Sequence, residues 1–145
     1  MTVGRICSRV VATATSNETI RAAAQRMSVN DVGTLVVLEP ADGGQPIGIV
    51  TDRDLAVRCV AADLDPDQMR IASVMSHPVH YVEESAPIED ALAQMAKVGT
   101  RRLLVRGDEG RLAGILSLDD ILDVLAEEAE AIGRLLKKQQ PHVPA

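Results

Sequence analysis

The sequence predicts an α/β fold of the α+β type, made of two tandem copies of one β-α-β-β-α unit. Three observations support this prediction. The second half of the chain repeats the first, and within each half the spacing of apolar residues switches between helical and strand-like periods. The composition is 46% hydrophobic but only 1% aromatic, so each half must build its core from aliphatic side chains.

The repeat has a constant offset of 68 residues through the first part of each copy. Aligned segments at this offset are Ile6-Cys7-Ser8 with Val74-Met75-Ser76, Ile20 with Ile88, Ala23 with Ala91, Met27 with Met95, and Leu35-Val36-Val37 with Leu103-Leu104-Val105. The offset then falls to 66, because a polar turn at 40–45 is two residues longer in the first copy, and 48–55 matches 114–121. We assign 1–66 to the first repeat, 67–125 to the second, and 126–145 to a helical extension with a frayed tail.

Apolar residues at i, i+3, i+4 and i+7 predict the first helix of each copy. They are Ile20, Ala23, Ala24 and Met27 in the first copy, and Ile88, Ala91, Leu92 and Met95 in the second. Thr15 with Glu18 has the spacing of a capping box, and Ser85 followed by Pro87 is a second helix start. Short β-branched runs predict strands at 10–13, 35–38, 47–50, 79–82, 103–105 and 112–116, with second helices at 52–62 and 119–136.

Three short strands with two helices on one face leave the other face of each sheet apolar and uncovered. We therefore expect the two sheets to pack on each other with pseudo-twofold symmetry and the helices outside. Clefts between the copies then lie at strand ends and helix starts, where small ligands bind.

Each copy ends its last strand with the pattern Gly-h-h-Thr/Ser-x-x-Asp, where h is aliphatic. A hydroxyl at a helix start, Thr51 or Ser117, can hold an anion together with free helix N–H groups. A carboxylate three residues later, Asp54 or Asp120, can accept both hydroxyls of a ribose. For each residue taken alone, ordinary helix capping is the favoured interpretation. The same Gly-to-Asp spacing in both copies raises the odds of a ligand site, although shared ancestry also explains it.

Basic residues distinguish the two copies. Arg101 and Arg102 open the central strand of the second copy, where the first copy has Gly33 and Thr34. A guanidinium at that position suits a phosphate, although a charged strand edge also discourages sheet association. Because the first copy lacks this basic pair, the two clefts are expected to differ. Arg53 lies between Thr51 and Asp54 and can reach the same anion, although an exposed arginine needs no special explanation.

Composition and sequence patterns disfavour several classes of function. A net charge of −6 and a single aromatic residue, Tyr81, disfavour nucleic-acid binding. The chain has no apolar run long enough to span a membrane and no signal-peptide pattern, so we expect a cytoplasmic protein. Cys7 and Cys59 are expected to be reduced and partly buried.

Catalytic and metal-binding functions are also disfavoured. The sequence has no nucleophile elbow, no phosphate-binding loop and no histidine paired by motif with Ser or Cys, so we expect no enzyme activity. His77 and His80 with the cysteines are an alternative zinc set, but the spacing of a four-ligand site is missing. We predict no metal site.

The tandem units resemble CBS domains, and their pairing resembles a Bateman module. The segments that carry the resemblance are 71–79, 99–105 and the two Gly-h-h-Thr/Ser-x-x-Asp ends, within a match from about residue 3 to 125. The resemblance implies a disc-like, often dimeric module that binds AMP, ATP, S-adenosylmethionine or NAD-like ligands in clefts between the repeats.

Specific residue roles also follow from the resemblance. It implies that Asp54 or Asp120 contacts ribose, that Thr51 or Ser117 contacts phosphate, and that Arg102 meets phosphates. It places adenine against the first strands, around Thr13 and Ala14 in the first copy and His80, Tyr81 and Val82 in the second.

The expected function is a non-catalytic regulatory sensor that needs no cofactor and signals to a separate effector protein. The alternative is an interaction or scaffold dimer that binds no ligand. The apolar positions of 126–138 can pack on a partner, but we expect this extension to fold against its own domain.

Overall fold

The computed structural model describes residues 1–39 and 44–141, which form two compact units. Val10–His80 form the first-repeat unit, and Met1–Arg9 with Tyr81–Ala145 form the second-repeat unit. These units do not coincide with the segments 1–66 and 67–125, which stay predictions about the sequence repeat. Most of the turn predicted at 40–45, and the end of the predicted frayed tail, lie outside the described residues.

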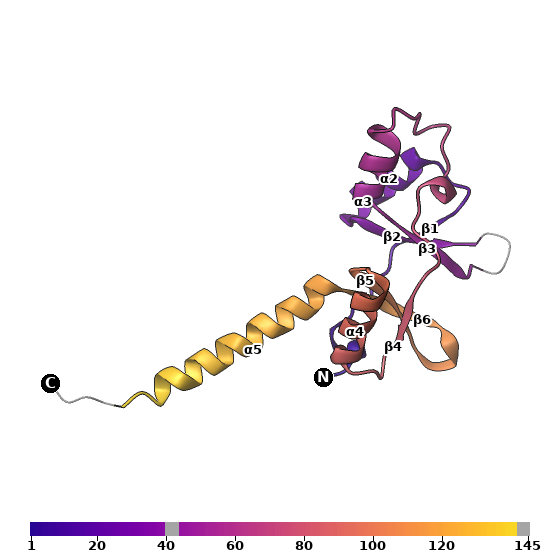
Figure 1. The fold of residues 1–145 in the computed structure, drawn as a ribbon. Helices are drawn as coiled ribbons and strands as arrows, with labels where there is room; N and C mark the ends of the chain where they lie inside the picture. Colours follow the sequence, from indigo (N-terminus) through magenta and orange to yellow (C-terminus); the bar gives the residue numbers. More distant parts are fainter. Residues whose placement is uncertain (40–43, 142–145) are drawn as a thin grey trace. The chain divides into compact units, whose positions relative to one another are not determined.

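The first-repeat unit contains a three-stranded sheet in the order β1-β2-β3. Its elements are β1 (Thr13–Thr15), α2 (Ile20–Asn30), β2 (Thr34–Leu38), β3 (Pro46–Thr51), α3 (Asp52–Leu55), a π-helical turn η1 (Ala56–Val60) and a 3₁₀ turn η2 (Ile71–Ser73). Strand β1 runs parallel to β2 and β3 runs antiparallel to it, since α2 provides the crossover between parallel strands. Helices α2 and α3 lie against the same face of the sheet (Figure 1).

The second-repeat unit repeats this arrangement, with a sheet in the order β4-β5-β6. Its elements are α1 (Val3–Ile6), β4 (Tyr81–Glu83), α4 (Ile88–Val98), β5 (Arg102–Arg106), a 3₁₀ turn η3 (Asp108–Gly110), β6 (Leu112–Ser117) and α5 (Leu118–Lys138). The pairing registers are equivalent in the two sheets, with Leu35 opposite Val50 in one and Leu103 opposite Leu116 in the other. The predicted α/β class and the β-α-β-β-α repeat are therefore confirmed.

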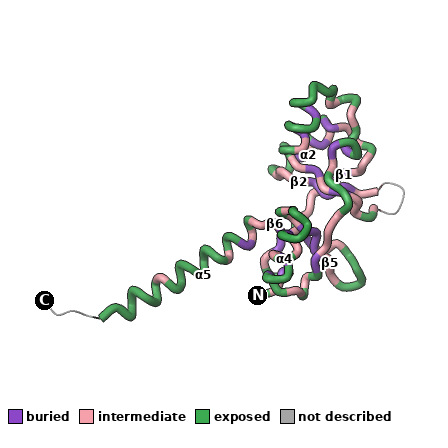
Figure 2. Tube along the Cα trace, in the orientation of Figure 1, coloured by how far each residue is buried: buried purple, intermediate pink, exposed green. Residues whose placement is uncertain are grey.

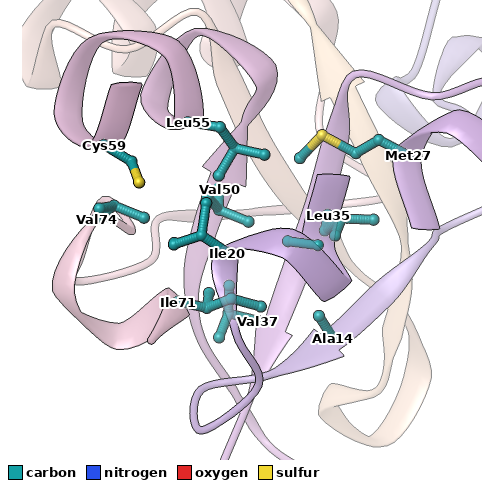
Figure 3. Packing of buried hydrophobic residues seen from close by; sticks show 11 residues of the cluster. Ala14, Ile20, Met27, Leu35, Val37, Val50, Leu55, Cys59, Ile71 and Val74 are labelled. Atoms are coloured by element: carbon teal, nitrogen blue, oxygen red, sulfur yellow. The ribbon is translucent and has the colours of Figure 1, made fainter. Parts of the chain in front are cut away.

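The core of the first-repeat unit lies between its sheet and its helices (Figure 3). Leu35 and Val37 of β2 are fully buried there, and Ile71 and Val74 join them from the segment that follows the last helical turn. Val36, between the two β2 residues, faces the other side of the sheet and is also buried. The segment after Pro66 thus completes the core of the first repeat.

The second-repeat unit receives the equivalent contribution from the N-terminus. Val3 of α1 is fully buried in a core cluster with Leu103 and Leu116. Cys7 belongs to the same cluster, and Cys59 belongs to the core of the first-repeat unit. Both cysteines are free and buried, more deeply than the sequence predicts. Burial raises the pKa of the Cys7 thiol.

Helix α2 differs in two details from the prediction. Ile20, Ala23 and Met27 are buried as predicted, but Ala24 is exposed, so the apolar face is narrower. The N-cap is Thr19, whose hydroxyl accepts a hydrogen bond from the Ala22 N–H at 3.1 Å. The capping box predicted at Thr15 is therefore wrong as a helix start.

Strand β1 begins three residues later than predicted. The prediction placed it at 10–13, but Val10 is 83% exposed and pairing with β2 runs from Thr13 to Thr15. Strand β4 likewise starts at Tyr81 rather than at residue 79. A β-branched residue favours a strand only where a neighbouring strand is available to pair with it.

The prediction that the C-terminal extension folds against its own domain is wrong. Helix α5 continues as one helix to Lys138, and only Ile121 among its residues is buried (Figure 2). Leu125 and Ile132 are 44% and 59% exposed. The extension does not fold against its own unit, because its large apolar residues beyond the first turns stay exposed.

A close backbone crossing explains the glycine of each Gly-h-h-Thr/Ser-x-x-Asp end. Ser76 pairs with Ile49 of β3, and Ser8 pairs with Ile115 of β6. A Cβ on Gly114 would lie 2.5 Å from the Ser8 carbonyl oxygen, and one on Gly48 would lie 2.9 Å from that of Ser76. Glycine is therefore required by the chain segment that crosses the strand.

We predict that Gly114→Ala destabilises the protein by about 1–3 kcal/mol, because backbone rather than a flexible side chain must move to admit the methyl group. Gly133→Ala is the matched control: apart from its chain neighbours and its own helix backbone, no atom of the described residues lies within 4 Å of its Cβ position, and an alanine in a helix gains up to about 1 kcal/mol. Urea unfolding of both variants measures the difference. Equal stabilities for the two variants would contradict the crossing as the reason for the glycine.

Candidate functional site

The two strand-to-helix junctions have the same local structure. Thr51 ends β3 and caps α3: its hydroxyl accepts a hydrogen bond from the Asp54 N–H at 3.2 Å, and the Asp54 carboxylate accepts one from the Thr51 N–H at 2.9 Å. Ser117 and Asp120 form the same reciprocal pair at 3.1 and 2.9 Å. The hydroxyl and carboxylate of each copy are thus brought together as a capping box.

Capping leaves part of each side chain available for a ligand. A hydroxyl that accepts one hydrogen bond still has its own proton to donate and a second lone pair. In each carboxylate, Oδ2 accepts the backbone N–H, and Oδ1 accepts no hydrogen bond from the described residues. Asp54 and Asp120 are both half-buried. Each junction can therefore cap its helix and present a donor and an acceptor at the same time.

The carboxylates of the two junctions differ in their surroundings. Arg58 lies one helical turn after Asp54, with its Nε 3.7 Å from Asp54 Oδ1. The equivalent position in α5 is Val124, and within residues 1–39 and 44–141 Asp120 forms no ion pair. Of the two carboxylates, Asp120 therefore has fewer charged neighbours that would compete with a ligand.

Arg102 lies directly opposite Ser117 in the pairing of β5 with β6. Because Leu103 and Leu116 face the core, Arg102 and Ser117 project from the other face of the sheet as neighbours. Arg102 is half-buried, and its guanidinium forms no ion pair in the part of the chain that the structure describes. The structure thus brings together a hydroxyl, a carboxylate and an unpaired cation.

The corresponding position of the first-repeat unit is less suited to an anion. Thr34 stands opposite Thr51, so no cation projects there from β2. The Asp52 carboxylate approaches Gly33 so closely that a Cβ on this glycine would lie 2.9 Å from Oδ2. The two junctions therefore share a backbone but differ in charge.

The other two predicted arginines are exposed. Arg101 has its guanidinium 3.7 Å from Asp119, a weak surface pair, while its carbonyl accepts a hydrogen bond from the Leu118 N–H at 2.8 Å. Arg53 lies in the first turn of α3, and its guanidinium has no ion pair among the described residues. Both lie beside a junction without being part of its hydrogen bonds.

The first strand of each unit, β1 or β4, offers a ligand fewer side chains than the sequence predicts. Ala14 and Val82 are buried in the two core clusters, so only their backbone atoms are available to a ligand. Thr13 and Tyr81 project from the opposite face of their sheets. His80 is half-buried and belongs to the first-repeat unit, whereas Tyr81 belongs to the second.

Tyr81 is held by Arg106, whose guanidinium lies 5.1 Å from the centre of its ring. Burial raises the pKa of the Tyr81 hydroxyl, and the nearby Arg106 charge opposes this shift. Arg106 also forms an ion pair with Glu83 at 2.6 Å. The ring is therefore fixed on the face of the sheet from which Arg102 also projects.

Sequence reasoning missed the side chains that hold the first strands. Arg26 donates a hydrogen bond to the Thr13 carbonyl at 3.0 Å, and Gln94 donates one to the Tyr81 carbonyl at 2.8 Å. Arg26 and Gln94 are related by the same 68-residue offset as the rest of the repeat. The sequence did contain a signal for them: in each copy a long polar side chain directly precedes a buried methionine.

Comparison with known proteins identifies the family. The CBS domain model matches residues 3–60 and 71–127, which together are most of the chain. The chain belongs to the CBS domain family. This confirms the resemblance and the tandem arrangement that the sequence predicts.

Three relatives illustrate what this CBS pair is similar to. Hypoxic response protein 1 of Mycobacterium tuberculosis is 35% identical over 113 residues, which cover 78% of this chain and 77% of that protein. The CBS domain protein PAE2072 from Pyrobaculum aerophilum, solved in complex with AMP, has a TM-score of 0.75 and 26% identity, covering 90% of this chain and 99% of that one. The CBS domain pair of protein MJ0100, solved with 5′-methylthioadenosine and S-adenosyl-L-methionine, has a TM-score of 0.75 and 25% identity, covering 88% and 98%.

The described part of this CBS pair has no cluster of three or more His, Cys, Asp or Glu side chains placed to hold a metal ion. His77 and His80 are therefore not assembled with the cysteines in these residues. Across residues 1–39 and 44–141, every helix is too short or too polar to cross a membrane.

Arg26 and Glu18 form an ionic network beside the first strand of the CBS pair. Arg26 donates to both carboxylate oxygens of Glu18, one of them at 2.8 Å, and Glu18 also accepts from the Thr15 N–H at 2.7 Å. The hydrogen bond from Arg26 is the main cause that lowers the pKa of Glu18 to about 2, and burial opposes it. This network ties the turn before α2 to the carbonyl of Thr13 in β1.

We predict that Glu18→Gln lowers stability at pH 7 by up to about 1 kcal/mol, since the pair is only partly buried. The folded-state pKa lies below the ordinary value of 4.5, so the contribution is complete above pH 4.5 and is lost as the pH falls towards 2. Denaturant unfolding of wild type and variant between pH 7 and pH 2.5 measures the gap. A gap that stays constant over this range would contradict the assigned pKa.

Proposed function

We propose that the protein is a non-catalytic regulatory module that binds an adenosine-type ligand, such as AMP, ATP, S-adenosylmethionine or an NAD-like molecule, and signals to a separate partner protein. The observation that carries the proposal is the second-repeat junction. There a hydroxyl, a partly free carboxylate and an unpaired guanidinium come together at Ser117, Asp120 and Arg102.

The chemistry of this junction suits a nucleoside phosphate. The second oxygen of Asp120 can accept hydrogen bonds from the vicinal hydroxyls of a ribose. The Ser117 hydroxyl and the Arg102 guanidinium can donate to a phosphate, which arginine contacts through two parallel hydrogen bonds. The proteins solved with AMP and with S-adenosyl-L-methionine support this ligand class.

The first-repeat junction suits a ligand without phosphate. Thr34 provides no charge there, Asp52 adds a negative one, and Arg58 competes for Asp54. We therefore propose that a phosphorylated ligand prefers the second-repeat junction, and that any binding at Thr51 and Asp54 favours an uncharged adenosine derivative.

Regulation requires two states of the protein with different affinities for the ligand. A net charge of −6 favours a protein partner over nucleic acid for the signal. A cytoplasmic location stays a prediction. The alternative is a dimeric scaffold that binds no ligand, which the exposed apolar side of α5 favours.

We predict that AMP raises the melting temperature of the wild-type protein, since a ligand at 100 times its Kd adds about 2.7 kcal/mol of stability. Asp120→Asn keeps an oxygen for the cap but removes the charge, and it should weaken AMP binding about 10–100-fold, the equivalent of about 1.5–3 kcal/mol. Arg102→Ala should weaken binding of AMP but not of adenosine. Thermal-shift titrations with both ligands measure these effects.

Asp123→Asn is the matched control, because Asp123 is an exposed acid one turn further along α5 and takes no part in the cap. Its response to AMP should equal that of wild type. Equal responses of wild type, Asp120→Asn and Arg102→Ala would remove the site assignment. No response of the wild type to any adenosine compound would favour the scaffold alternative.

A further inference from the structure

Most of α5 lies outside the core of its unit. Its first turns pack on the second-repeat unit, where Ile121 is fully buried and Leu118 packs against the core. From Leu122 onward no residue of the helix is buried (Figure 2). Five large apolar residues are 44–60% exposed: Leu122, Leu125, Ile132, Leu135 and Leu136. Helices in proteins owe most of their stability to the packing of an apolar face, so a partner surface would stabilise this stretch.

The exposed apolar residues follow the spacing of a coiled coil. Leu122, Leu125, Ala129, Ile132 and Leu136 are separated by alternating steps of three and four residues, and we call them the α5 seam. Leu118 continues the same pattern into the packed part of the unit. A repeat that averages 3.5 residues is the one that keeps a seam facing a second helix along its length.

The charges of α5 are segregated along its axis. Residues 119–130 contain Asp119, Asp120, Asp123, Glu127, Glu128 and Glu130 and no basic residue, whereas residues 131–138 contain Arg134, Lys137 and Lys138 and no acidic residue. Two copies side by side in the same direction would place acid beside acid and base beside base. Two copies in opposite directions place each acidic half beside a basic half, which is electrostatically complementary.

We infer that the α5 seam pairs with the α5 seam of a second copy of this chain, with the two helices antiparallel. The partner is a second copy of this chain because a single α5 carries both the acidic half and the basic half that attract each other. Its apolar seam also matches the same seam on another copy. If the two helices cross at residue 130, the midpoint of the exposed part 122–138, the exposed parts of both copies lie alongside each other over their full length. Dimerisation through α5 leaves Ser117 and Asp120 in their cap, so it is independent of ligand binding.

Light scattering of the full chain after gel filtration tests the seam. The wild type should have twice the chain mass of 15.5 kDa. Leu125→Lys with Ile132→Lys should reduce it to the mass of one chain, with the helical circular dichroism of the packed units retained. Val57→Lys with Val60→Lys is the control: both valines are exposed, at 51% and 71%, but lie in the first-repeat unit, and this variant should stay dimeric.

Salt and spin-label distances test the direction of the helices. Raising the salt concentration should weaken an antiparallel dimer by screening its attraction, whereas it would strengthen a parallel one. Labels at Ala131→Cys should lie close together across the pair. Labels at Lys138→Cys should lie roughly 24 Å apart along the axis, since about 16 residues at about 1.5 Å each separate the two positions. The native cysteines are buried and should react slowly.

Three results would overturn the inference. They are a monomeric wild type, a dimer that survives the two lysines in the α5 seam, or a dimer that is lost in the Val57 and Val60 control instead. If the Lys138→Cys labels lie close together and salt strengthens the dimer, pairing through the α5 seam would stand. The antiparallel direction would then be wrong. A loss of AMP binding alone would affect the proposed function and leave this inference standing.

Discussion

The reciprocal hydrogen bonds at each strand-to-helix junction are the interaction on which the rest of the structure depends. At Thr51 and Ser117 the chain must stop pairing with its neighbouring strand and begin a helix within one residue. The capping box satisfies two backbone N–H groups that would otherwise have no partner, and so fixes the direction in which the helix leaves the sheet. The same two side chains retain hydrogen-bonding capacity, which the proposed ligand site uses together with Arg102.

Duplication gives this protein two copies of one backbone on which few side chains need to differ. Arg58 is replaced by Val124 next to the carboxylate, and Thr34 is replaced by Arg102 opposite the hydroxyl. Each change alters charge without altering the hydrogen bonds of the cap. A pair of repeats can therefore keep one stable scaffold while its two junctions acquire different ligand preferences. The proposed preference of the second-repeat junction for a phosphorylated ligand follows from this difference.

Much of the fold could be predicted because the repeat confirms each element twice. The apolar spacing of Ile88, Ala91 and Met95 identifies α4, and the same spacing 68 residues earlier identifies α2. The matched hydroxyl and carboxylate positions were also visible in the sequence, together with their capping role. The reason for the glycine of each pattern became clear only in the structure, where the backbone at Ser8 and Ser76 passes close to it.

The predictions that failed depend on tertiary contacts. Val10 has the residue type of a strand, but pairing with β2 begins only at Thr13. Thr15 and Glu18 do form a hydrogen-bonded turn, but Arg26 recruits the carboxylate and the helix starts after Thr19. The apolar residues of α5 indicate that the helix buries a face, yet local spacing does not distinguish its own unit from a second molecule. These cases show where a local pattern is insufficient.

The most direct test of the junction as a binding site is an NMR titration of the ¹⁵N-labelled full chain with AMP. Backbone amide signals of Arg102, Ser117 and Asp120 should shift progressively and saturate, with smaller changes at Thr51 and Asp54. Saturable shifts confined to other parts of the chain, with the amides of both junctions unmoved, would contradict the central claim that the helix caps also form the ligand site.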